Sequence, residues 1–275
     1  MARKKSPGLR LRQALEAPAM RLGLAVVPRL PRAAVRWLAC RLGDGAYLFS
    51  ARSRRLGLAN LDLAFGATMP PAEKRRILRA SLRTFSLPML DLLWFSRNSA
   101  ARMERWLAVA PSMRDAMASR VARVGVTGHF GNWELVGRYW ALAAGGLTSV
   151  AMPLKNPAVG ELLREARELT GQQIVAREGA LKKLVRALRD GGTVGLLLDQ
   201  NTDPGEGGTF ADFFGKPASV SPAAGVLASM TGAEIIFAYA LPQPDGTYRG
   251  EMPHRIPAAE IAAMDRATAA QELTR

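Results

Sequence analysis

The stretch "VARVGVTGHFGNWELVGRYWALAAGGLTSVAM", residues 121–152, decides how the middle of the chain folds. Residues 121–127 are rich in valine, as in a buried strand, and residues 132–146 have helical composition and end at paired glycines. Residues 148–152 form a second short apolar run. A strand, a helix and a strand in this order predict a β-α-β unit with parallel strands.

The same alternation continues toward the C-terminus, and a long helix precedes it. We predict helices at residues 70–95, 157–171, 179–192 and 222–232, strands at residues 172–176, 193–199 and 234–241, a Gly-rich loop at 200–217, and a turn at Asp245-Gly246 before a further strand. Strands that alternate with helices predict an α/β fold whose central, mainly parallel sheet is flanked by helices. The final turn adds an antiparallel pair, so the sheet is expected to be mixed.

Charge is distributed unevenly along the 275 residues. The chain has 38 Lys and Arg against 23 Asp and Glu, a net charge of +15. Residues 1–60 hold 13 of the basic residues and only two acids, Glu16 and Asp44. Apolar and aromatic residues interleave with these arginines, which is typical of a segment that lies in the headgroup region of an anionic membrane. We therefore predict a basic amphipathic membrane-associating segment at 1–60, followed by an α/β domain at 61–275.

The basic segment has two other interpretations, a nucleic-acid-binding region and a solvated tail. A nucleic-acid-binding protein would show a helix-turn-helix, paired cysteines and histidines, or aromatic-rich strand motifs, and the sequence has none of these. We therefore expect no nucleic-acid partner. A solvated basic tail without a partner stays open as the plainer alternative.

Cysteine usage and apolar run length indicate the compartment. Cys40 is the only cysteine, so no disulfide can form within the chain and a reducing environment is expected. The N-terminal region breaks its apolar stretches with arginines, unlike a secretory signal. Its longest clean run, residues 22–28, is too short to cross a bilayer. We expect a peripheral protein and not one that spans a membrane.

His129 is one of two histidines in the chain, and it falls where a strand ends and a helix begins. Open α/β sheets place their sites at such positions. Glu134 lies in the first turn of that helix, and a carboxylate bound to one ring nitrogen makes the other nitrogen a better base. Thr127 and Ser149 are not placed like a nucleophile in a triad. The pair therefore suits direct activation of a substrate hydroxyl, with no covalent enzyme intermediate.

Two plainer interpretations of this pair remain. The His-x-x-x-x-Glu spacing is a weak signal by itself, because a histidine and a glutamate often lie near each other. A zinc site on a helix typically uses two histidines, yet His254 is 125 residues away from His129 and no ligand cluster accompanies either one. We expect no metal and no cofactor.

Several segments together resemble the lipid A biosynthesis acyltransferase family, which is related to the glycerolipid acyltransferases. The most specific is "GHFGNWEL" (128–135), which resembles the family's HxxxxD/E block with its flanking FGNWE. The other matching segments occur in the family's order and are "LGLANLDLAFG" (56–66), "MPLKNP" (152–157), "REARELTGQQIVAREG" (164–179), "LVRALRDGGTVGLLLDQN" (184–201) and "GTFADFFGKPASVSPAAGVLASMTGAEIIFAYA" (208–240). The resemblance covers about residues 15–255.

The resemblance implies a glycerolipid-acyltransferase-like fold and an O-acyltransferase. Such an enzyme moves a fatty acyl chain from an acyl-carrier-protein or acyl-CoA thioester to a hydroxyl of a lipid or glycolipid acceptor, such as a lipid A precursor. The resemblance also implies a location on the cytoplasmic face of the inner membrane. His129 would be the general base and Glu134 would orient and polarise it, the roles that the residue pattern had indicated. The thioester is already activated, so no enzyme nucleophile is needed.

Candidate substrate-binding residues surround this pair in the sequence. Arginines suit phosphate or headgroup contacts because the guanidinium binds such groups bidentately, although a solvated helix face is an equally good interpretation of a helical arginine. Polar residues at the end of a buried strand share the expected sheet edge with the histidine, and an aromatic beyond them could line an acyl-chain groove or cover the end of the core. The candidates are Asn132, Lys155, Arg167, Arg177, Asp199, Gln200 and Phe213.

Two departures from the family pattern leave the acceptor and the C-terminus open. Ser229 stands where some lipid A enzymes have arginine, so a lipid A precursor, a mannosylated or other glycolipid and a lysophospholipid all remain candidates. The sequence ends at "AAMDRATAAQELTR" (262–275), where family members continue into a Trp- and Arg-rich segment, so we expect a truncated or divergent member. A thioester or ester hydrolase and an inactive membrane-binding scaffold are the alternatives to a transferase.

Overall fold

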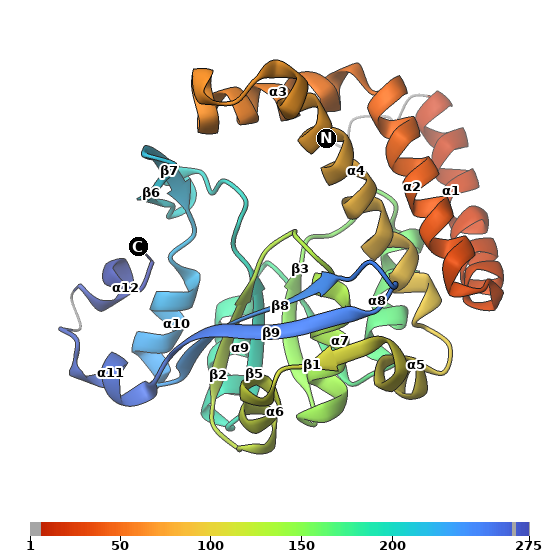
Figure 1. Cartoon of the computed structure of the whole chain (residues 1–275). Helices are drawn as coiled ribbons and strands as arrows, with labels where there is room; N and C mark the ends of the chain where they lie inside the picture. The colour runs from red at the N-terminus through yellow and green to blue at the C-terminus, as the bar shows by residue number, and fades with distance from the viewer. Residues whose placement is uncertain (1–6, 266–267, 275) are drawn as a thin grey trace.

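The computed structural model describes residues 7–265 and 268–274, and Figure 1 shows a central sheet with helices packed around it. The helices are α1 (Pro7–Val26), α2 (Arg32–Phe49), α3 (Ala51–Phe65), α4 (Pro71–Trp94), α5 (Ser99–Trp106), α6 (Pro111–Ala118), α7 (Trp133–Ala143), α8 (Pro157–Glu168), α9 (Ala180–Arg189), α10 (Ala223–Thr231), α11 (Ala258–Ala263) and α12 (Ala269–Glu272). The strands are β1 (Leu107–Val109), β2 (Arg123–Thr127), β3 (Leu147–Ala151), β4 (Gln172–Ala176), β5 (Thr193–Leu197), β6 (Thr209–Phe213), β7 (Lys216–Val220), β8 (Glu234–Pro242) and β9 (Tyr248–Ile256).

The central sheet is mixed. In the described part of the chain, seven strands form it in the order β1-β9-β8-β2-β5-β3-β4. Neighbouring strands are parallel except for β8 and β9, which follow the predicted turn and pair antiparallel. The prediction of a mainly parallel, mixed sheet flanked by helices is confirmed. Strand β1 was not predicted, because three residues are too few to show a strand pattern.

Both faces of the sheet are covered, as parallel strands require. Successive residues of a strand point to opposite faces, so Ile235 and Ile236 of β8 belong to two different cores. Ile236 packs in a core with residues of α2, α4 and α7, and Ile235 packs in a core with residues of α9, α10 and α11. Helix α7, which directly follows the loop that holds His129, packs in the first of these cores through Leu135 and Val136.

Helices α2 and α4 pack closely against each other. Gly43 makes this approach possible, because a Cβ at that position would overlap the backbone of Arg83. Next to it, Asp44 accepts hydrogen bonds from Arg79 Nε at 2.7 Å and from Arg83 Nε at 2.7 Å. These hydrogen bonds hold the pKa of Asp44 well below its ordinary value. One of the two acids of the basic segment thus fastens that segment to α4.

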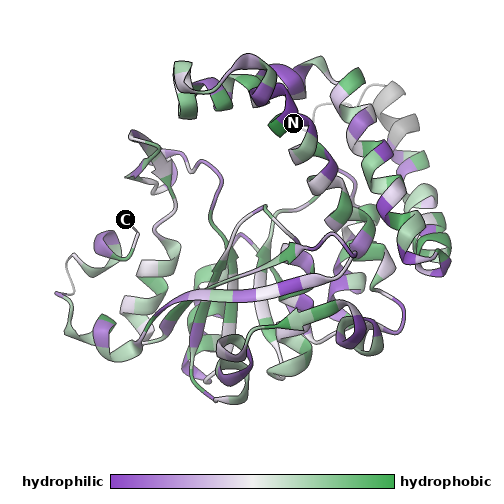
Figure 2. Cartoon of the chain, in the orientation of Figure 1, coloured by the Kyte–Doolittle hydropathy of each residue, from purple (hydrophilic) through white to green (hydrophobic). Residues whose placement is uncertain are grey.

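Helix α3 has no buried residue, but it contacts α4, where Gly57 approaches Leu78 and Lys74 Nζ donates to Asp62 from 2.6 Å. Hydrophilic and hydrophobic residues are interspersed along it (Figure 2). Across residues 7–265 and 268–274, no helix is both long enough and apolar enough to cross a membrane. The membrane association predicted for residues 1–60, and the division of the chain at residue 60, stay predictions.

The Gly-rich loop predicted at residues 200–217 is partly wrong. Residues 209–220 form a two-stranded antiparallel sheet of their own, in which β6 pairs with β7. Its turn contains Gly215 at φ 70°, so this glycine marks a tight hairpin turn and not irregular structure.

A buried carboxylate, Asp91 of α4, connects the N-terminal helices to the loop before α7. Arg32 of α2 donates two hydrogen bonds to it, with 3.1 Å between Arg32 Nη2 and Asp91 Oδ2. Asn132 Nδ2 donates to the same carboxylate from 3.0 Å, and the Tyr248 hydroxyl of β9 donates from 2.5 Å. Burial raises the pKa of Asp91, although its three donors act in the opposite direction. The cluster of Arg32, Asp91, Asn132 and Tyr248 is called the Asp91 cluster below.

The Asp91 cluster predicts a large stability effect from a small change. Asp91→Asn removes the counter-charge of the buried Arg32, and an uncompensated buried charge costs about 3–5 kcal/mol in the free energy of unfolding. Urea denaturation followed by circular dichroism measures this loss.

The matched control is Glu73→Gln on the same helix, whose ion pair with Arg76 is exposed to solvent. Its expected loss is below about 1 kcal/mol. Equal losses in the two variants would contradict the role assigned to Asp91.

Candidate active site

The loop between β2 and α7 holds His129 at the carboxyl end of a central strand. Gly131 has φ 58°, and a Cβ there would overlap the carbonyl oxygen of Ala240, so only glycine fits. Asn132 N donates to that same carbonyl from 2.7 Å. The Asn132 side chain then caps α7, because its Oδ1 accepts from Leu135 N at 2.9 Å while its Nδ2 binds Asp91. Backbone and side chain together fix the loop.

The imidazole of His129 is held by Asp199, which follows β5. The two groups meet because β2 and β5 are parallel neighbours whose carboxyl ends lie at the same edge. His129 Nδ1 lies 2.8 Å from Asp199 Oδ1, and the backbone N–H of His129 donates to Asp199 Oδ2 from 2.7 Å. With its proton on Nδ1, the ring donates to the carboxylate and keeps an Nε2 lone pair that can accept a proton. Gln200 Nε2 lies 3.5 Å from Nδ1, and the Trp133 ring packs edge-on against the imidazole with 5.0 Å between ring centroids.

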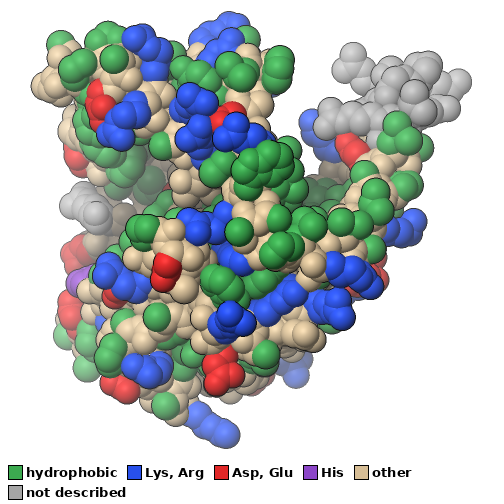
Figure 3. Space-filling view, turned by 45° about the vertical axis from the view of Figure 1, so that its right-hand side comes forward, with side chains coloured by type: hydrophobic (Ala, Val, Ile, Leu, Met, Phe, Trp, Pro, Cys, Tyr) green, Lys and Arg blue, Asp and Glu red, His purple; other side chains and the backbone are tan. Residues whose placement is uncertain are grey.

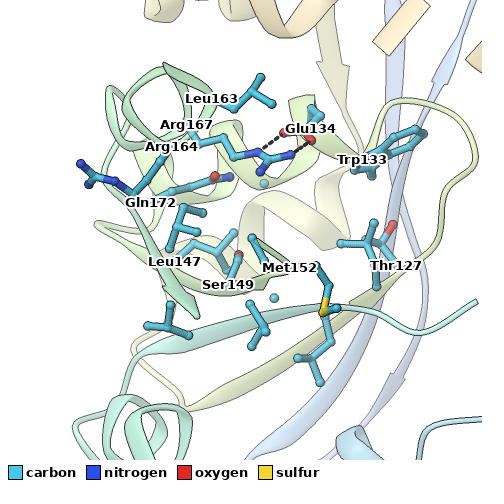
Figure 4. A pocket seen from close by; sticks show the side chains of 18 of the residues that line it. Thr127, Trp133, Glu134, Leu147, Ser149, Met152, Leu163, Arg164, Arg167 and Gln172 are labelled. Atoms are coloured by element: carbon cyan, nitrogen blue, oxygen red, sulfur yellow. Dashed lines mark hydrogen bonds and ion pairs between the residues drawn. The ribbon is translucent and has the colours of Figure 1, made fainter. Parts of the chain in front are cut away.

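Glu134 has a different partner from the one expected. Its carboxylate accepts from Arg167 of α8 in a bidentate arrangement, at 2.9 Å from Nε and 2.5 Å from Nη2, and Figure 4 shows this pair beside the cavity described below. Among the described residues, the side-chain hydrogen bonds of Glu134 go to Arg167, so the expectation that Glu134 orients His129 is corrected. The helical position of Glu134 turns its side chain toward α8, whereas Asp199 approaches the imidazole from the neighbouring strand.

The Glu134 carboxylate balances two arginines. Burial acts to lower the pKa of Arg167, but the hydrogen bonds and charge of Glu134 outweigh burial and raise it. Arg138, one turn further along α7, is also buried, and burial lowers its pKa to about 10 while the charge of Glu134 opposes that change. Arg138 Nη2 donates to the carbonyl of Ala166 from 2.7 Å. Glu134 thus provides negative charge to two arginines, the half-buried Arg167 and the buried Arg138.

A cavity of about 790 Å³ begins at His129 and runs between the sheet and helices α7 and α8. His129, Glu134, Arg167 and Gln200 line it together, and apolar residues of β2, β3, β4 and β5 form its other wall. The cavity reaches Leu147 at the opposite end of β3 from the edge that holds His129. Figure 4 places Leu147 and Ser149 on one side and the Glu134–Arg167 pair on the other. Its size and apolar lining are typical of a ligand pocket.

The predicted site residues separate into two groups in space. His129, Glu134, Arg167 and Gln200 line the cavity, and Asp199 holds His129 from behind. The other candidates do not lie on the cavity wall formed by the described residues. Asn132 is fully buried in the Asp91 cluster, and Phe213 lies on the exposed hairpin. Arg177 pairs with the exposed Glu206. Lys155 is exposed, and its backbone carbonyl accepts a hydrogen bond from Gln13.

Sequence reasoning missed three members of the Asp91 cluster, although one signal was present. Asp91 stands inside the apolar run "LPMLDLLWF" (87–95), and a lone acid in such a run indicates a buried, paired carboxylate. Its partners Arg32 and Tyr248 are too far away in sequence to be recognised. Within the described residues, no group of three or more His, Cys, Asp or Glu side chains is arranged to hold a metal ion.

Comparison with known proteins defines the class. The profile of the bacterial lipid A biosynthesis acyltransferases matches residues 4–275, and the chain belongs to this family. The chain is therefore an acyltransferase.

Two kinds of characterised relative are similar to it. The lipid A biosynthesis lauroyltransferase of Escherichia coli (strain K12) is 27% identical over 233 residues, which cover 82% of this chain and 74% of that enzyme. The phosphatidylinositol mannoside acyltransferase of Mycobacterium tuberculosis (strain ATCC 25618 / H37Rv) is 26% identical over 156 residues, which cover 55% of this chain and 48% of that protein.

The Glu134–Arg167 pair predicts a coupling between the two residues. Glu134→Gln leaves Arg167 and Arg138 without their shared counter-charge, and the free energy of unfolding should fall by about 3 kcal/mol. Replacing Arg167 by Gln in the same protein should recover part of this loss, because one uncompensated charge disappears. Urea denaturation of the single and double variants gives the coupling energy.

Glu161→Gln is the control, since Glu161 forms an exposed pair with Arg164 on α8. Its loss should stay below about 1 kcal/mol. Strict additivity of the Glu134 and Arg167 losses would show that the two residues do not depend on each other.

Proposed function

We propose that this chain is a membrane-associated O-acyltransferase that moves a fatty acyl chain from an acyl-carrier-protein or acyl-CoA thioester to a hydroxyl of a glycolipid acceptor. The observation that carries the proposal is the His129–Asp199 pair at the mouth of a largely apolar cavity. A base held by a carboxylate can activate a hydroxyl, and the cavity offers a place for a hydrocarbon chain.

In the proposed reaction His129 moves one proton, while the thioester bond of the donor is exchanged for an ester bond of the acceptor. Nε2 takes the proton of the acceptor hydroxyl while the hydroxyl oxygen attacks the thioester carbonyl. The resulting tetrahedral intermediate collapses when the carbon–sulfur bond breaks. The imidazolium returns its proton to the leaving thiolate, so the products are an ester and a free thiol. No enzyme acyl intermediate forms, because the donor is already activated.

Asp199 and Glu134 receive different roles in this proposal. Asp199 fixes the orientation of the imidazole through two hydrogen bonds and stabilises the positive charge that forms on the ring. Glu134 acts through Arg167, because it fixes the guanidinium at the cavity wall near His129. Arg167 is the candidate for binding a phosphate or headgroup of a substrate.

In this proposal the acyl chain lies in the cavity and not against Phe213 of the hairpin. The thioester carbonyl has to lie near His129, at the carboxyl end of the strands. From there the cavity leads toward Leu147 along about 13 Å of parallel strand, since Ala151 and Leu147 are four residue steps of about 3.3 Å apart on β3. Apolar contact along this length favours a fatty chain over a short polar acyl group.

A glycolipid is the acceptor we favour, because the two kinds of relative are named for lipid A and for phosphatidylinositol mannoside, both of which carry sugar hydroxyls. Membrane association is supported by the basic, amphipathic composition of residues 1–60. The cytoplasmic face of the inner membrane is the location at which both thioester donors are available to such an enzyme.

The proposed reaction yields an acylated lipid whose formation depends on His129. Membranes that contain the wild-type protein, given labelled acyl-carrier-protein or acyl-CoA thioester, should yield a new acylated lipid in mass spectrometry. His129→Ala should abolish it, and Asp199→Asn should lower kcat roughly 100-fold with a smaller change in KM, because general-base catalysis contributes roughly 10²–10⁴-fold.

The control is His254→Ala, which removes the other histidine at an exposed position on β9 and should leave the rate unchanged. Label released only as free fatty acid, and only by the wild type, would identify a hydrolase. Equal lipid products from wild type and His129→Ala would refute the proposed base.

The far end of the cavity should limit the length of the acyl chain. Leu147→Ala removes side-chain volume at the far end of the cavity, so the preference among donors should shift toward longer chains. Competition between labelled thioesters of different length measures the ratio of their kcat/KM values, and this ratio does not depend on how much protein is folded. Leu169→Ala, at an exposed position after α8, is the control and should leave the ratio unchanged. An unchanged ratio in Leu147→Ala would place the chain elsewhere.

A further inference from the structure

The hairpin of β6 and β7 has no place in the chemistry proposed above. It stands apart from the seven-stranded sheet and is connected to β5 through the residues that follow Asp199 and Gln200. Phe213, which the sequence suggested for an acyl-chain groove, lies on this hairpin and points to solvent with 66% of its surface exposed. The hairpin therefore needs a different explanation.

The hairpin turn places an aromatic residue where the backbone disfavours it. Phe213 pairs with Lys216, so Phe214 and Gly215 form a two-residue turn, with φ 56° and 70°. Positive φ at both central positions favours asparagine, aspartate or glycine and is unfavourable for a bulky residue. Asp212 Oδ1 accepts from Gly215 N at 3.0 Å and holds the turn. A phenylalanine kept in this conformation indicates a function for its ring.

The rings at this turn are left in solvent. Phe214 is 52% exposed and Phe210 of β6 is 58% exposed, so a third aromatic joins the two at the tip. The Phe213 and Phe214 rings meet edge to face with 4.7 Å between centroids. The Phe65 ring, at the end of α3, packs edge-on against Phe214 with 5.3 Å between centroids. The hairpin tip and α3 thus form one continuous aromatic surface.

Helix α3 contributes an amphipathic face to this surface. Arg52, Leu56 and Leu63 recur at helical spacing on one side of α3, and both leucines are more than half exposed. A helix of fifteen residues depends on packing of its apolar face for stability. Leu56 and Leu63 lie outside both hydrophobic cores, so these two side chains are available to an external partner.

We propose that the hairpin tip and α3 form a lipid-binding surface that inserts its aromatic rings into the interface of an anionic bilayer. The surface is defined by Leu56, Leu63, Phe65, Phe210, Phe213 and Phe214. Exposed phenylalanines and leucines next to basic residues are typical of interfacial binding, where rings enter the headgroup boundary and arginines contact anionic lipid.

Charge favours a lipid partner over a protein partner. Arg52 and Arg55 on α3 and Lys216 next to the turn are exposed, and so are two acids, Asp62 of α3, which pairs with Lys74, and Asp212 of the hairpin. Arg52 and Arg55 belong to residues 1–60, where 13 basic residues stand against two acids. Figure 3 shows hydrophobic and basic side chains side by side over the upper part of one face of the molecule. An anionic lipid surface satisfies this large positive excess, and a bilayer accepts exposed rings without a shaped groove.

This inference rests on the proposed function for its purpose, since a lipid acceptor has to be reached at a membrane. Its test does not depend on turnover. Purified full chain is mixed with vesicles of phosphatidylglycerol and phosphatidylethanolamine, or of phosphatidylcholine alone, and the bound fraction is measured by sedimentation. Wild type should bind the anionic vesicles and bind phosphatidylcholine far more weakly.

The decisive variant is Phe214→Asn. Asparagine tolerates positive φ better than phenylalanine, so the hairpin should fold at least as well and Tm should not fall. Loss of the ring should weaken binding to the anionic vesicles roughly tenfold, as expected from the apolar area that one phenylalanine buries. Phe213→Ser should have a similar effect, and the two together should weaken binding further.

The control is Leu142→Asn, which removes an exposed apolar side chain in the last turn of α7, outside the surface. Wild-type binding in the Phe213 and Phe214 variants, or an equal loss in Leu142→Asn, would overturn the proposal. Failure of the wild type to bind any vesicle would overturn it as well and would leave a protein partner for the surface. His129→Ala should bind vesicles as wild type does, so failure of the catalytic proposal and failure of this one are separate results.

Discussion

The buried carboxylate of Asp91 is the constraint on which the position of the active-site loop depends. It receives hydrogen bonds from α2, from β9 and from the residue that caps α7, so three elements distant in sequence meet at one charge. An ionised carboxylate inside a core is tolerated only when every partner is present. We therefore expect cooperative folding of the three elements that bind Asp91, which are helix α2, strand β9 and the His129 loop. The basic N-terminal segment is part of this unit through Arg32 and is not an appendage.

Two carboxylates near His129 show how position on the fold assigns roles to chemically similar groups. Asp199 follows a strand whose neighbour ends at His129, so parallel pairing delivers it to the imidazole. Glu134 is in the first turn of α7 and faces α8, where Arg167 is its partner and Arg138 adds a second positive charge. A carboxylate committed to two arginines is a poor partner for a base that has to gain and lose a proton. Because each carboxylate has its own partner, the Glu134–Arg167 pair does not depend on the state of His129.

Features set by neighbouring residues in the sequence could be predicted, whereas contacts between residues far apart in the sequence could not. The β-α-β unit around His129, the mixed sheet and helix α4 follow from local periodicity and turn residues, and these predictions were confirmed. The pairing of His129 with Asp199 required knowledge of which strands are neighbours, because 70 residues separate the two side chains. The glycines between 205 and 215 suggested a loop, and two strands of five residues each are too short to show a clear strand pattern. Glu134 was given the wrong partner because spacing along a helix limits reach but does not determine which neighbouring helix the side chain faces.

The two ends of the aromatic surface lead back to the two carboxylates that hold the active-site loop. From the hairpin, the chain runs directly to Gln200 and Asp199, which hold the imidazole. From α3, it runs into α4 and reaches Asp91, which binds the cap of α7. Phe65 and Phe214 are in contact, so the chain leads from this one contact to the His129 loop in two directions. One direction runs through α4, and the other runs through β5, which pairs with β2. The lipid-binding surface proposed at this contact is therefore built from the same segments that hold His129. In the proposed reaction, one substrate lies within the cavity between the sheet and helices α7 and α8 and the other arrives from a membrane, so the membrane contact and the candidate base are connected through a short length of chain.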